Sequence, residues 1–228
     1  MNTNKLQVFV FAMLFVVGAF TGCVDEDDET TTDNSIKIGF LNPITGPLEP
    51  DAAGFKWGAD QAISDLAKMY PDETFKLIEL DSGCSGDVAG PAAQTLVDSG
   101  VVAVVGAACS GASMSANAVL AAAGIPMISY ASTNPGLSDE AKYPHFYRNV
   151  PSDAIQGPAG AAMMLDAGVT NESLAILHMT NDYGSGLADS IKAAWEENGK
   201  LCSAGMQGYE ETTTNFDAMV ANVTGASD

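Results

Sequence analysis

The chain has 228 residues, of which 29 are acidic and 9 are basic, so its formal net charge at pH 7 is −20. A surface this acidic excludes nucleic acid as the expected partner, because phosphate contacts need lysine and arginine, and it disfavours adsorption to anionic lipid. Hydrophobic residues make up 46% of the chain and aromatic residues only 7%, which fits an alanine-rich globular α/β protein.

The N-terminus has the features of an export signal. Lys5 supplies a positive start, residues 8–20 form an apolar stretch too short to span a bilayer, and small residues lead to Cys23. We expect a lipoprotein signal peptide over residues 1–22, with Cys23 becoming the lipidated N-terminus. An ordinary secretory signal or an uncleaved anchor is the alternative.

An acidic segment follows the signal. Residues 23–35 contain a run of Asp and Glu that cannot form a core, which predicts a disordered, solvated tether. Without residues 1–22 the chain would have 8 basic and 29 acidic residues, a net charge of −21. We therefore expect an extracytoplasmic protein, held at the outer face of the cell membrane through its lipid anchor or located in the periplasm.

From Ser35 onward, the apolar pattern alternates between strands and helices, and the order βαβαβαβ predicts a doubly wound parallel sheet. The wholly apolar stretch 101–106 is typical of a central parallel strand. We expect a Rossmann-like N-terminal lobe over 36–150. Its predicted strands cover 36–41, 75–80, 101–106 and 125–129, and its predicted helices cover 55–69, 88–98 and 112–123.

The pattern changes near Pro151. Residues 146–151 have no helix before them, so we interpret them as a segment that crosses out of the first lobe. A second series of helices and strands then predicts a partial second lobe over 151–228. Its elements are helix 154–167, strand 174–179, helix 184–198, strand 201–208 and the start of a helix at 216–223.

Two cysteines 25 positions apart, Cys84 and Cys109, follow strands that we expect to be neighbours. Strand ends side by side in a parallel sheet can place two Cα atoms within disulfide range. Such a bridge would stabilise the fold by about 3 kcal/mol and would persist only in an oxidising compartment. The alternative is a pair of buried free thiols. Cys202 is expected to remain unpaired.

Three loops lie at the carboxyl ends of the predicted strands, where ligands bind in sheets of this type. The loop 109–111 offers backbone N–H groups and the hydroxyl of Ser110. It suits a carboxylate better than a nucleotide, because it lacks the lysine of a phosphate loop. Loop 129–135 offers hydroxyls, and loop 181–186 carries Tyr183, which could cover a ligand from across a cleft. The alternatives are plain helix caps, a turn of turn-forming residues and a packed ring.

Several motifs occur together in an order that resembles a known family. They are the turn up to Pro47, the cysteine pair with its Cys-Ser loop, Ile-Ser-x-Ala-Ser-Thr-Asn-Pro, Phe-Tyr-Arg-Asn-Val-Pro-Ser-Asp-x-x-Gln-Gly and Asp-Tyr-Gly-x-Gly-Leu-Ala. From Ile36 to the end, the chain resembles the leucine/isoleucine/valine-type periplasmic binding proteins, which are the type I solute receptors of ABC importers. The resemblance implies two Rossmann-like lobes with parallel sheets and a ligand clamped between them. Family members are longer, so the second lobe is expected to be incomplete.

The resemblance also implies roles for individual residues. Ser110 and backbone amides would hold the α-carboxylate of an amino acid. The carbonyl of Ala131 and the hydroxyl of Thr133 would hold its ammonium group, with Ser132 lying between them. The ring of Tyr183 would pack on the ligand.

One departure from the family bears on the ligand. Asp51 stands near the position where many members have an aromatic residue, which would favour a cationic or polar ligand over leucine. Arg148 and Asp153 are expected to be structural.

The expected function is that of an extracytoplasmic substrate-binding lipoprotein of an ABC importer, with an amino acid, urea or a small amide as ligand and ABC permease subunits as partners. A ligand-sensing receptor without transport and an extracellular amide-processing enzyme are the alternatives. We expect no catalysis, because His145 and His178 are the only histidines and neither a zinc-site spacing nor a Gly-x-Ser-x-Gly elbow occurs. No metal or cofactor is expected.

Overall fold

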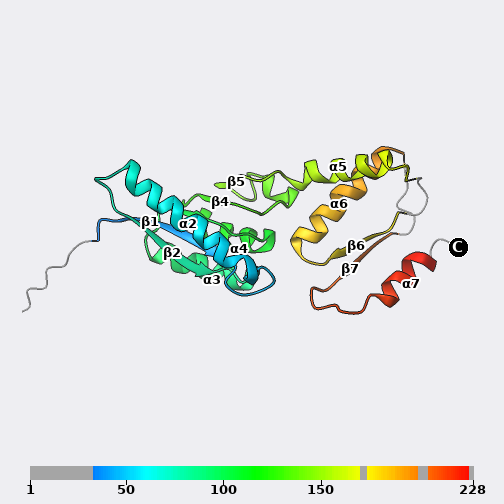
Figure 1. The fold of residues 1–228 in the computed structure, drawn as a ribbon, viewed down its shortest axis with the longest axis horizontal. Helices are drawn as coiled ribbons and strands as arrows, with labels where there is room; N and C mark the ends of the chain where they lie inside the picture. The colour runs from blue at the N-terminus through cyan, green and yellow to red at the C-terminus, as the bar shows by residue number, and fades with distance from the viewer. Residues whose placement is uncertain (1–32, 170–173, 200–204, 226–228) are drawn as a thin grey trace, which may run out of the picture. The chain divides into compact units, whose positions relative to one another are not determined.

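The structure is a computed structural model that describes residues 33–169, 174–199 and 205–225 (Figure 1). The predicted signal peptide, Cys23, most of the predicted tether and Cys202 lie outside the described residues. In chain order the elements are β1 (Ile36–Asn42), α2 (Glu49–Met69), β2 (Phe75–Asp81), α3 (Gly86–Asp98), β3 (Ala103–Val105), α4 (Ser110–Ala122), β4 (Met127–Ser129), the 3-10 helix η1 (Pro135–Ser138), β5 (Phe146–Arg148), α5 (Asp153–Asp166), β6 (Ile176–Met179), α6 (Asp182–Glu197), β7 (Met206–Tyr209) and α7 (Asp217–Gly225).

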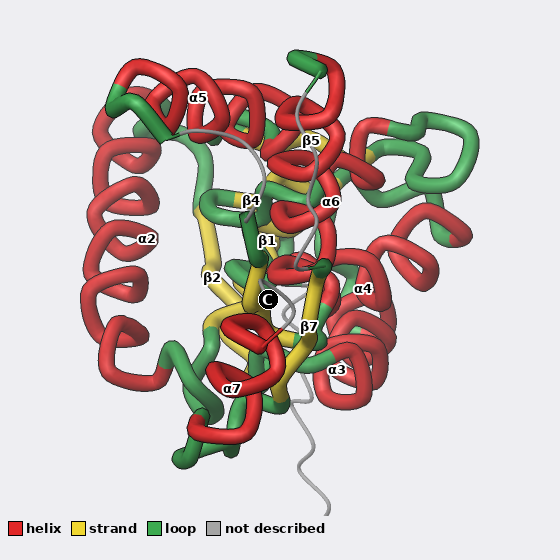
Figure 2. The backbone as a smooth tube through the Cα atoms, turned by 90° about the vertical axis from the view of Figure 1, so that its right-hand side faces the viewer, coloured by secondary structure: helices red, strands yellow, loops and turns green. Residues whose placement is uncertain are grey.

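Strands β1 to β5 form one parallel sheet in the order β2-β1-β3-β4-β5. Helix α2 lies on one side of β1 and β2, and α3 and α4 lie on the other side (Figure 2). We call this sheet with α2, α3 and α4 the first lobe. The expected α/β fold with a doubly wound parallel sheet is confirmed.

The core of the first lobe lies between the sheet and the pair α3 and α4. Its helical part is built mainly from alanine: Ala89 and Ala93 on α3 and Ala112 and Ala116 on α4 are fully buried. Small side chains let two helices approach each other and the sheet closely. This close packing brings the N-terminal ends of α3 and α4 together at the carboxyl edge of the sheet.

The strand β5 belongs to the first sheet, which differs from the expectation. Residues 146–151 were expected to cross out of the first lobe, but Phe146–Arg148 pairs in parallel with β4, in the register Met127↔Phe146. A strand of only three residues, with Tyr147 exposed at its centre, has too short an apolar pattern to be distinguished from a connecting segment.

Helix α2 also begins earlier than expected, at Glu49 rather than Phe55. Its first turn contains a proline, whose missing N–H group costs nothing at that position. Glu49 and Asp51 in the same turn are favoured by the helix dipole. The segment from 49 to 54 has little apolar periodicity, so these start signals are what define the helix.

The two parallel strands β6 and β7, with α5, α6 and α7, form what we call the second lobe. Trp195 is fully buried and packs with Ala161 and Ala194 where α5 and α6 meet. The predicted strand 201–208 begins outside the described residues, and its described part runs to Tyr209. None of the helices in the described part of the chain is long and apolar enough to cross a membrane.

Candidate ligand-binding site

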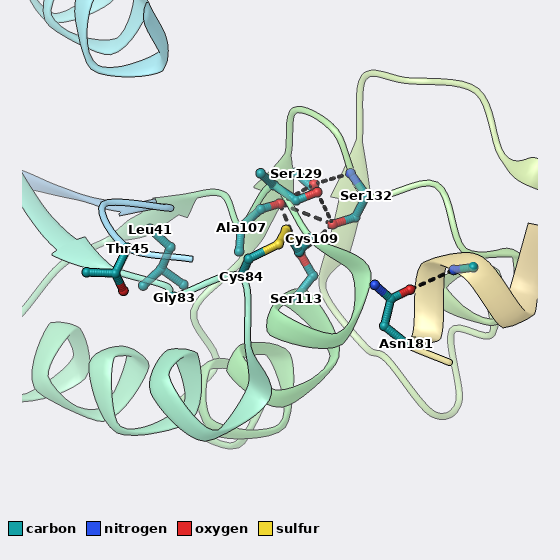
Figure 3. The surroundings of a disulfide bond; sticks show 12 residues. Leu41, Thr45, Gly83, Cys84, Ala107, Cys109, Ser113, Ser129, Ser132 and Asn181 are labelled. Atoms are coloured by element: carbon teal, nitrogen blue, oxygen red, sulfur yellow. Dashed lines mark hydrogen bonds between the residues drawn. A yellow bond between two sulfur atoms is a disulfide. The ribbon is translucent and has the colours of Figure 1, made fainter. Parts of the chain in front are cut away.

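Cys84 and Cys109 form a disulfide, with their Cα atoms 5.1 Å apart (Figure 3), so the predicted bridge is confirmed. The reason given for it was wrong, because β2 and β3 are not neighbours: β1 lies between them. The bridge instead joins the loop before α3 to the residue that precedes α4. The packing of α3 against α4 brings these two loops together.

A cavity of about 620 Å³ lies beside this bridge, at the carboxyl edge of the five-stranded sheet. Both lobes contribute to its walls. Four of the predicted ligand residues and both cysteines are among the lining residues, which include Cys84, Cys109, Ser110, Ala131, Thr133 and Tyr183. The structure therefore brings together in one cavity most of the residues selected from the sequence.

The start of α4 forms one wall of the cavity. The residue that precedes the helix is Cys109, and its side chain makes no capping hydrogen bond. Ser110 is 2% exposed, and its hydroxyl accepts a hydrogen bond from the backbone N–H of Asn134 at 3.3 Å. The hydroxyl of Ser113 donates a hydrogen bond of 3.1 Å to the carbonyl of Ala107. Because neither serine caps the helix, the first-turn N–H groups have no side-chain cap, and a helix start of this kind can accommodate an anion.

The loop after β4 forms the adjacent wall, and its residues alternate in direction. Ala131 and Thr133 line the cavity. Ser132 is buried, and its hydroxyl contacts the carbonyls of Ala107 and Ala108 at 3.1 Å and the hydroxyl of Ser113 at 2.8 Å (Figure 3). Ser132 therefore holds the loop after β4 against the loop after β3, and the structure does not place it among the cavity-lining residues.

The hydroxyl of Thr133 donates a hydrogen bond of 2.8 Å to a carboxylate oxygen of Asp153, which is completely buried. Burial raises the pKa of Asp153, while the hydrogen bond from Thr133 and the positive charge of Arg148 act in the opposite direction. Arg148 also donates to the backbone carbonyl of Asn134 at 2.9 Å. Asp153 and Arg148 were expected to be structural, and both hold the cavity loop in place.

The second lobe supplies the opposite wall. Tyr183 lies in the first turn of α6, and 41% of it is exposed. The side chain that caps α6 is that of Asn181, which accepts from the N–H of Gly184 at 2.8 Å. The side chain of Asp182, the next residue, is not the cap of this helix. Asp182 and Glu211 are the charged side chains among the residues that line the cavity, and both are acidic.

The structure gives Asp51 a different place from the one expected. It lies exposed in the first turn of α2 and is not among the residues that line the cavity. Pro47 and Leu48 line this part of the rim instead. The helix that carries Asp51 begins six residues earlier than the pattern indicated, and the acidic residues that line the cavity are Asp182 and Glu211.

The turn at this rim depends on Asp81 and Gly46. Burial works to raise the pKa of Asp81, but hydrogen bonds from the hydroxyl and N–H of Thr45 and from the N–H of Gly83 hold it below its usual range. Gly46 has a φ of +90°, and a Cβ there would come 2.5 Å from the carbonyl oxygen of Gly83. Only glycine fits this contact beside Cys84.

Within the described ranges, no three His, Cys, Asp or Glu side chains gather as a metal site.

Comparison with known proteins agrees with this architecture. The family model for periplasmic binding proteins matches residues 35–227. The chain therefore belongs to the periplasmic binding protein family, and the resemblance found in the sequence is confirmed.

Relatives that the chain matches include binding proteins for leucine and other amino acids. The chain is 29% identical over 192 residues to the leucine-specific-binding protein of Salmonella typhimurium, covering 83% of this chain and 51% of that protein. It is 27% identical over 192 residues to a leucine-, isoleucine-, valine-, threonine- and alanine-binding protein of Pseudomonas aeruginosa, with coverage of 83% and 51%. The chain spans about half the length of the curated relatives it matches.

Solved structures give the same picture. The branched-chain amino acid transporter substrate-binding protein LivJ of Streptococcus pneumoniae, in complex with isoleucine, superposes with a TM-score of 0.69 at 25% identity, covering 84% of this chain and 54% of that one. An ABC transporter substrate-binding protein of Desulfitobacterium hafniense in complex with Leu gives a TM-score of 0.63 at 26% identity, with coverage of 81% and 53%. The type I periplasmic-binding-protein fold is thereby confirmed.

Proposed function

We propose that this protein is the extracytoplasmic substrate-binding component of an ABC importer and that it captures an amino acid or a related small amide between its lobes. The observation that carries the proposal is the cavity beside the Cys84–Cys109 bridge, which both lobes line. Relatives and neighbours whose names specify leucine and isoleucine support the same class of ligand.

The chemistry of the cavity wall supports a zwitterion. A carboxylate would be bound by the start of α4, where the helix dipole and Ser110 act together. An ammonium group would be bound by the carbonyl of Ala131 and the hydroxyl of Thr133, and Tyr183 would cover the ligand from the second lobe. A sugar phosphate or nucleotide fits less well, because no lysine or arginine is among the described residues that line this cavity.

The cellular setting belongs to the same proposal. The disulfide supports an oxidising, extracytoplasmic location. We propose further that Cys23 carries a lipid anchor, that residues 23–35 tether the folded part, that the lobes divide near Pro151, and that permease subunits receive the loaded protein. We propose binding without catalysis.

Calorimetric titration of the natural full-length protein tests this function. The panel contains L-leucine, L-serine, L-lysine, L-glutamine, urea, acetamide, glucose and inorganic phosphate. We expect saturable binding of an amino acid or amide and no release of product on prolonged incubation. Binding of glucose or phosphate alone would contradict the ligand class, and turnover of an amide would favour the enzyme alternative. Binding without uptake, in cells that carry the matching permease, would favour the sensing receptor.

A further inference from the structure

Asn134, in the loop after β4, is hydrogen-bonded to four neighbouring elements, and it is only 9% exposed. Its backbone N–H donates to the hydroxyl of Ser110 on α4 at 3.3 Å, and its backbone carbonyl accepts from Arg148 on β5 at 2.9 Å. Its side-chain oxygen accepts from the N–H of Gly136 in η1 at 2.7 Å. Its side-chain nitrogen donates to the backbone carbonyl of Asp182, the first residue of α6. Of these four bonds, the one from the side-chain nitrogen reaches the second lobe.

The capping of η1 does not explain why an amide side chain stands at position 134. Asn134 precedes η1, and the cap uses only its side-chain oxygen. Serine and aspartate provide an oxygen for the same purpose. The feature that distinguishes asparagine from both is the side-chain nitrogen, which donates to α6. The amide therefore has a second role, which is to join the lobes.

Two glycines allow the lobes to approach each other at this point. A Cβ at Gly186 on α6 would come 2.9 Å from the Cγ of Asn134 and 3.2 Å from the Cδ of Pro135. A Cβ at Gly111 on α4 would come 2.5 Å from a carboxylate oxygen of Asp182. Each lobe thus has a glycine where a side chain of the other lobe lies against its backbone. A side chain at Gly186 would displace the amide of Asn134.

The bond to α6 acts on the residue that follows Asp182. The carbonyl of Asp182 and the N–H of Tyr183 belong to one planar peptide group, so a bond that holds the carbonyl also fixes the start of Tyr183. Asp182 and Tyr183 line the cavity beside the disulfide, whereas Asn134 is not among its lining residues. Tyr183 is 41% exposed, so packing alone holds its ring only in part. Asn134 therefore supports this wall of the cavity from behind.

We propose that Asn134 is a positioning residue, whose side-chain amide holds the start of α6 against the first lobe and so places Tyr183 at the cavity before a ligand binds. This inference rests on the proposed function, since it concerns a wall of the same cavity. A wall that is already in place raises affinity, because the ligand does not have to order it on binding.

Two substitutions at position 134 remove the donor and keep an oxygen that can cap η1. The natural full-length protein, Asn134→Ser and Asn134→Asp are titrated with L-leucine by calorimetry. We expect Asn134→Ser to weaken binding by about three- to tenfold. Asn134→Asp should weaken it by about tenfold or more, because a carboxylate oxygen would face the carbonyl of Asp182. Asn134→Ser introduces no charge, so unchanged affinity in this variant would overturn the proposal.

A substitution in the second lobe tests the same contact from the other side. Gly186→Ala should weaken L-leucine binding about as much as Asn134→Ser, although alanine favours helix formation over glycine. Gly160→Ala on α5 is the matched control, because its Cβ would lie 3.9 Å from the Cγ1 of Ile191, an ordinary contact distance. Gly160→Ala should leave the affinity unchanged. Equal affinities of Gly186→Ala and Gly160→Ala would contradict the proposed contact.

A double-mutant cycle with Tyr183→Ala separates positioning from a merely structural role. If Asn134 acts through Tyr183, adding Asn134→Ser to Tyr183→Ala will produce no further loss of L-leucine affinity. An equal loss with and without the ring would mean that Asn134 only stabilises the fold, which overturns the proposal.

Amide hydrogen exchange without any ligand keeps one test independent of the proposed function. In Asn134→Ser, we expect faster exchange over residues 181–187, at the start of α6, and unchanged exchange over residues 86–98, in α3. If L-leucine binds to none of the proteins but exchange at 181–187 is faster, the amino-acid class fails and the positioning role of Asn134 holds. Unchanged exchange at 181–187 would overturn the positioning role itself.

Discussion

The disulfide gives the most quantitative prediction about the first lobe. Cys84 and Cys109 are 25 positions apart, and their bridge joins the loop before α3 to the start of α4. In the chain-entropy model, a closed loop of this length restricts the unfolded chain by about 3.5 kcal/mol at 25 °C. We therefore expect the variant Cys84→Ala/Cys109→Ala to lose about 3 kcal/mol of unfolding free energy.

Urea denaturation of the wild type and this double variant, followed by tryptophan fluorescence and circular dichroism, measures that loss. Reductant should lower the urea midpoint of the wild type toward that of the variant. It should not change the midpoint of the variant, which is therefore the control for other effects of the reductant. A loss of unfolding free energy below about 1 kcal/mol would refute the reasoning. It would mean that the bridge restricts the unfolded chain little and that helix packing alone holds these loops together in the folded state. Because both cysteines also line the cavity, ligand affinity should fall together with stability.

Four further predictions concern single positions. Ser110→Ala should cost about 1–3 kcal/mol of binding free energy for an amino acid by calorimetry, and no change would remove Ser110 from the carboxylate site. L-glutamate should bind about tenfold or more weakly than L-glutamine, because Asp182 and Glu211 repel its side chain. The variant Glu211→Gln should reduce this difference in affinity. Tighter binding of L-glutamate than of L-glutamine by the wild type would contradict the prediction. Gly46→Ala should destabilise the protein by about 1–3 kcal/mol in urea, because φ there is +90°, whereas Gly58→Ala, in open space on α2, should be neutral or stabilising; equal effects would refute the steric argument. Finally, burial raises the pKa of Asp153 above its unfolded value of about 3.9, so the folded state takes up more protons between these two values. The unfolding free energy of the wild type relative to Asp153→Asn should therefore increase as the pH falls through the raised pKa toward about 4, and a decrease in denaturation series over that range would contradict the sign.

Much of the architecture could be predicted because strands and helices alternate in long, strongly patterned segments. The loops that follow strands β3 and β4 could then be assigned to one edge of the sheet. Ser110, selected from its loop, and Thr133, selected through the family resemblance, both line the cavity there. The parts that were missed lack such a pattern. Strand β5 has three residues, and the start of α2 is marked by a proline and acidic residues rather than by apolar periodicity.

Two features of the cavity needed the three-dimensional structure. Ser132 lies between two lining residues, and only the contacts of its hydroxyl show that it points into the protein. Glu211 is one acidic residue among many, and its position just after β7 was the only available signal, since carboxyl ends of strands are where ligands bind. The strand order was not predictable either. The disulfide was therefore predicted correctly, but on the incorrect assumption that β2 and β3 are neighbours.

A crystal structure of the natural full-length protein with its bound amino acid or amide would show where the ligand binds. We expect the ligand in the cavity beside the Cys84–Cys109 bridge. For an amino acid, the carboxylate would lie within hydrogen-bond distance of Ser110 and the first N–H groups of α4, and the ammonium group would face Ala131 and Thr133. A ligand bound elsewhere, or one whose carboxylate points away from the start of α4, would contradict it.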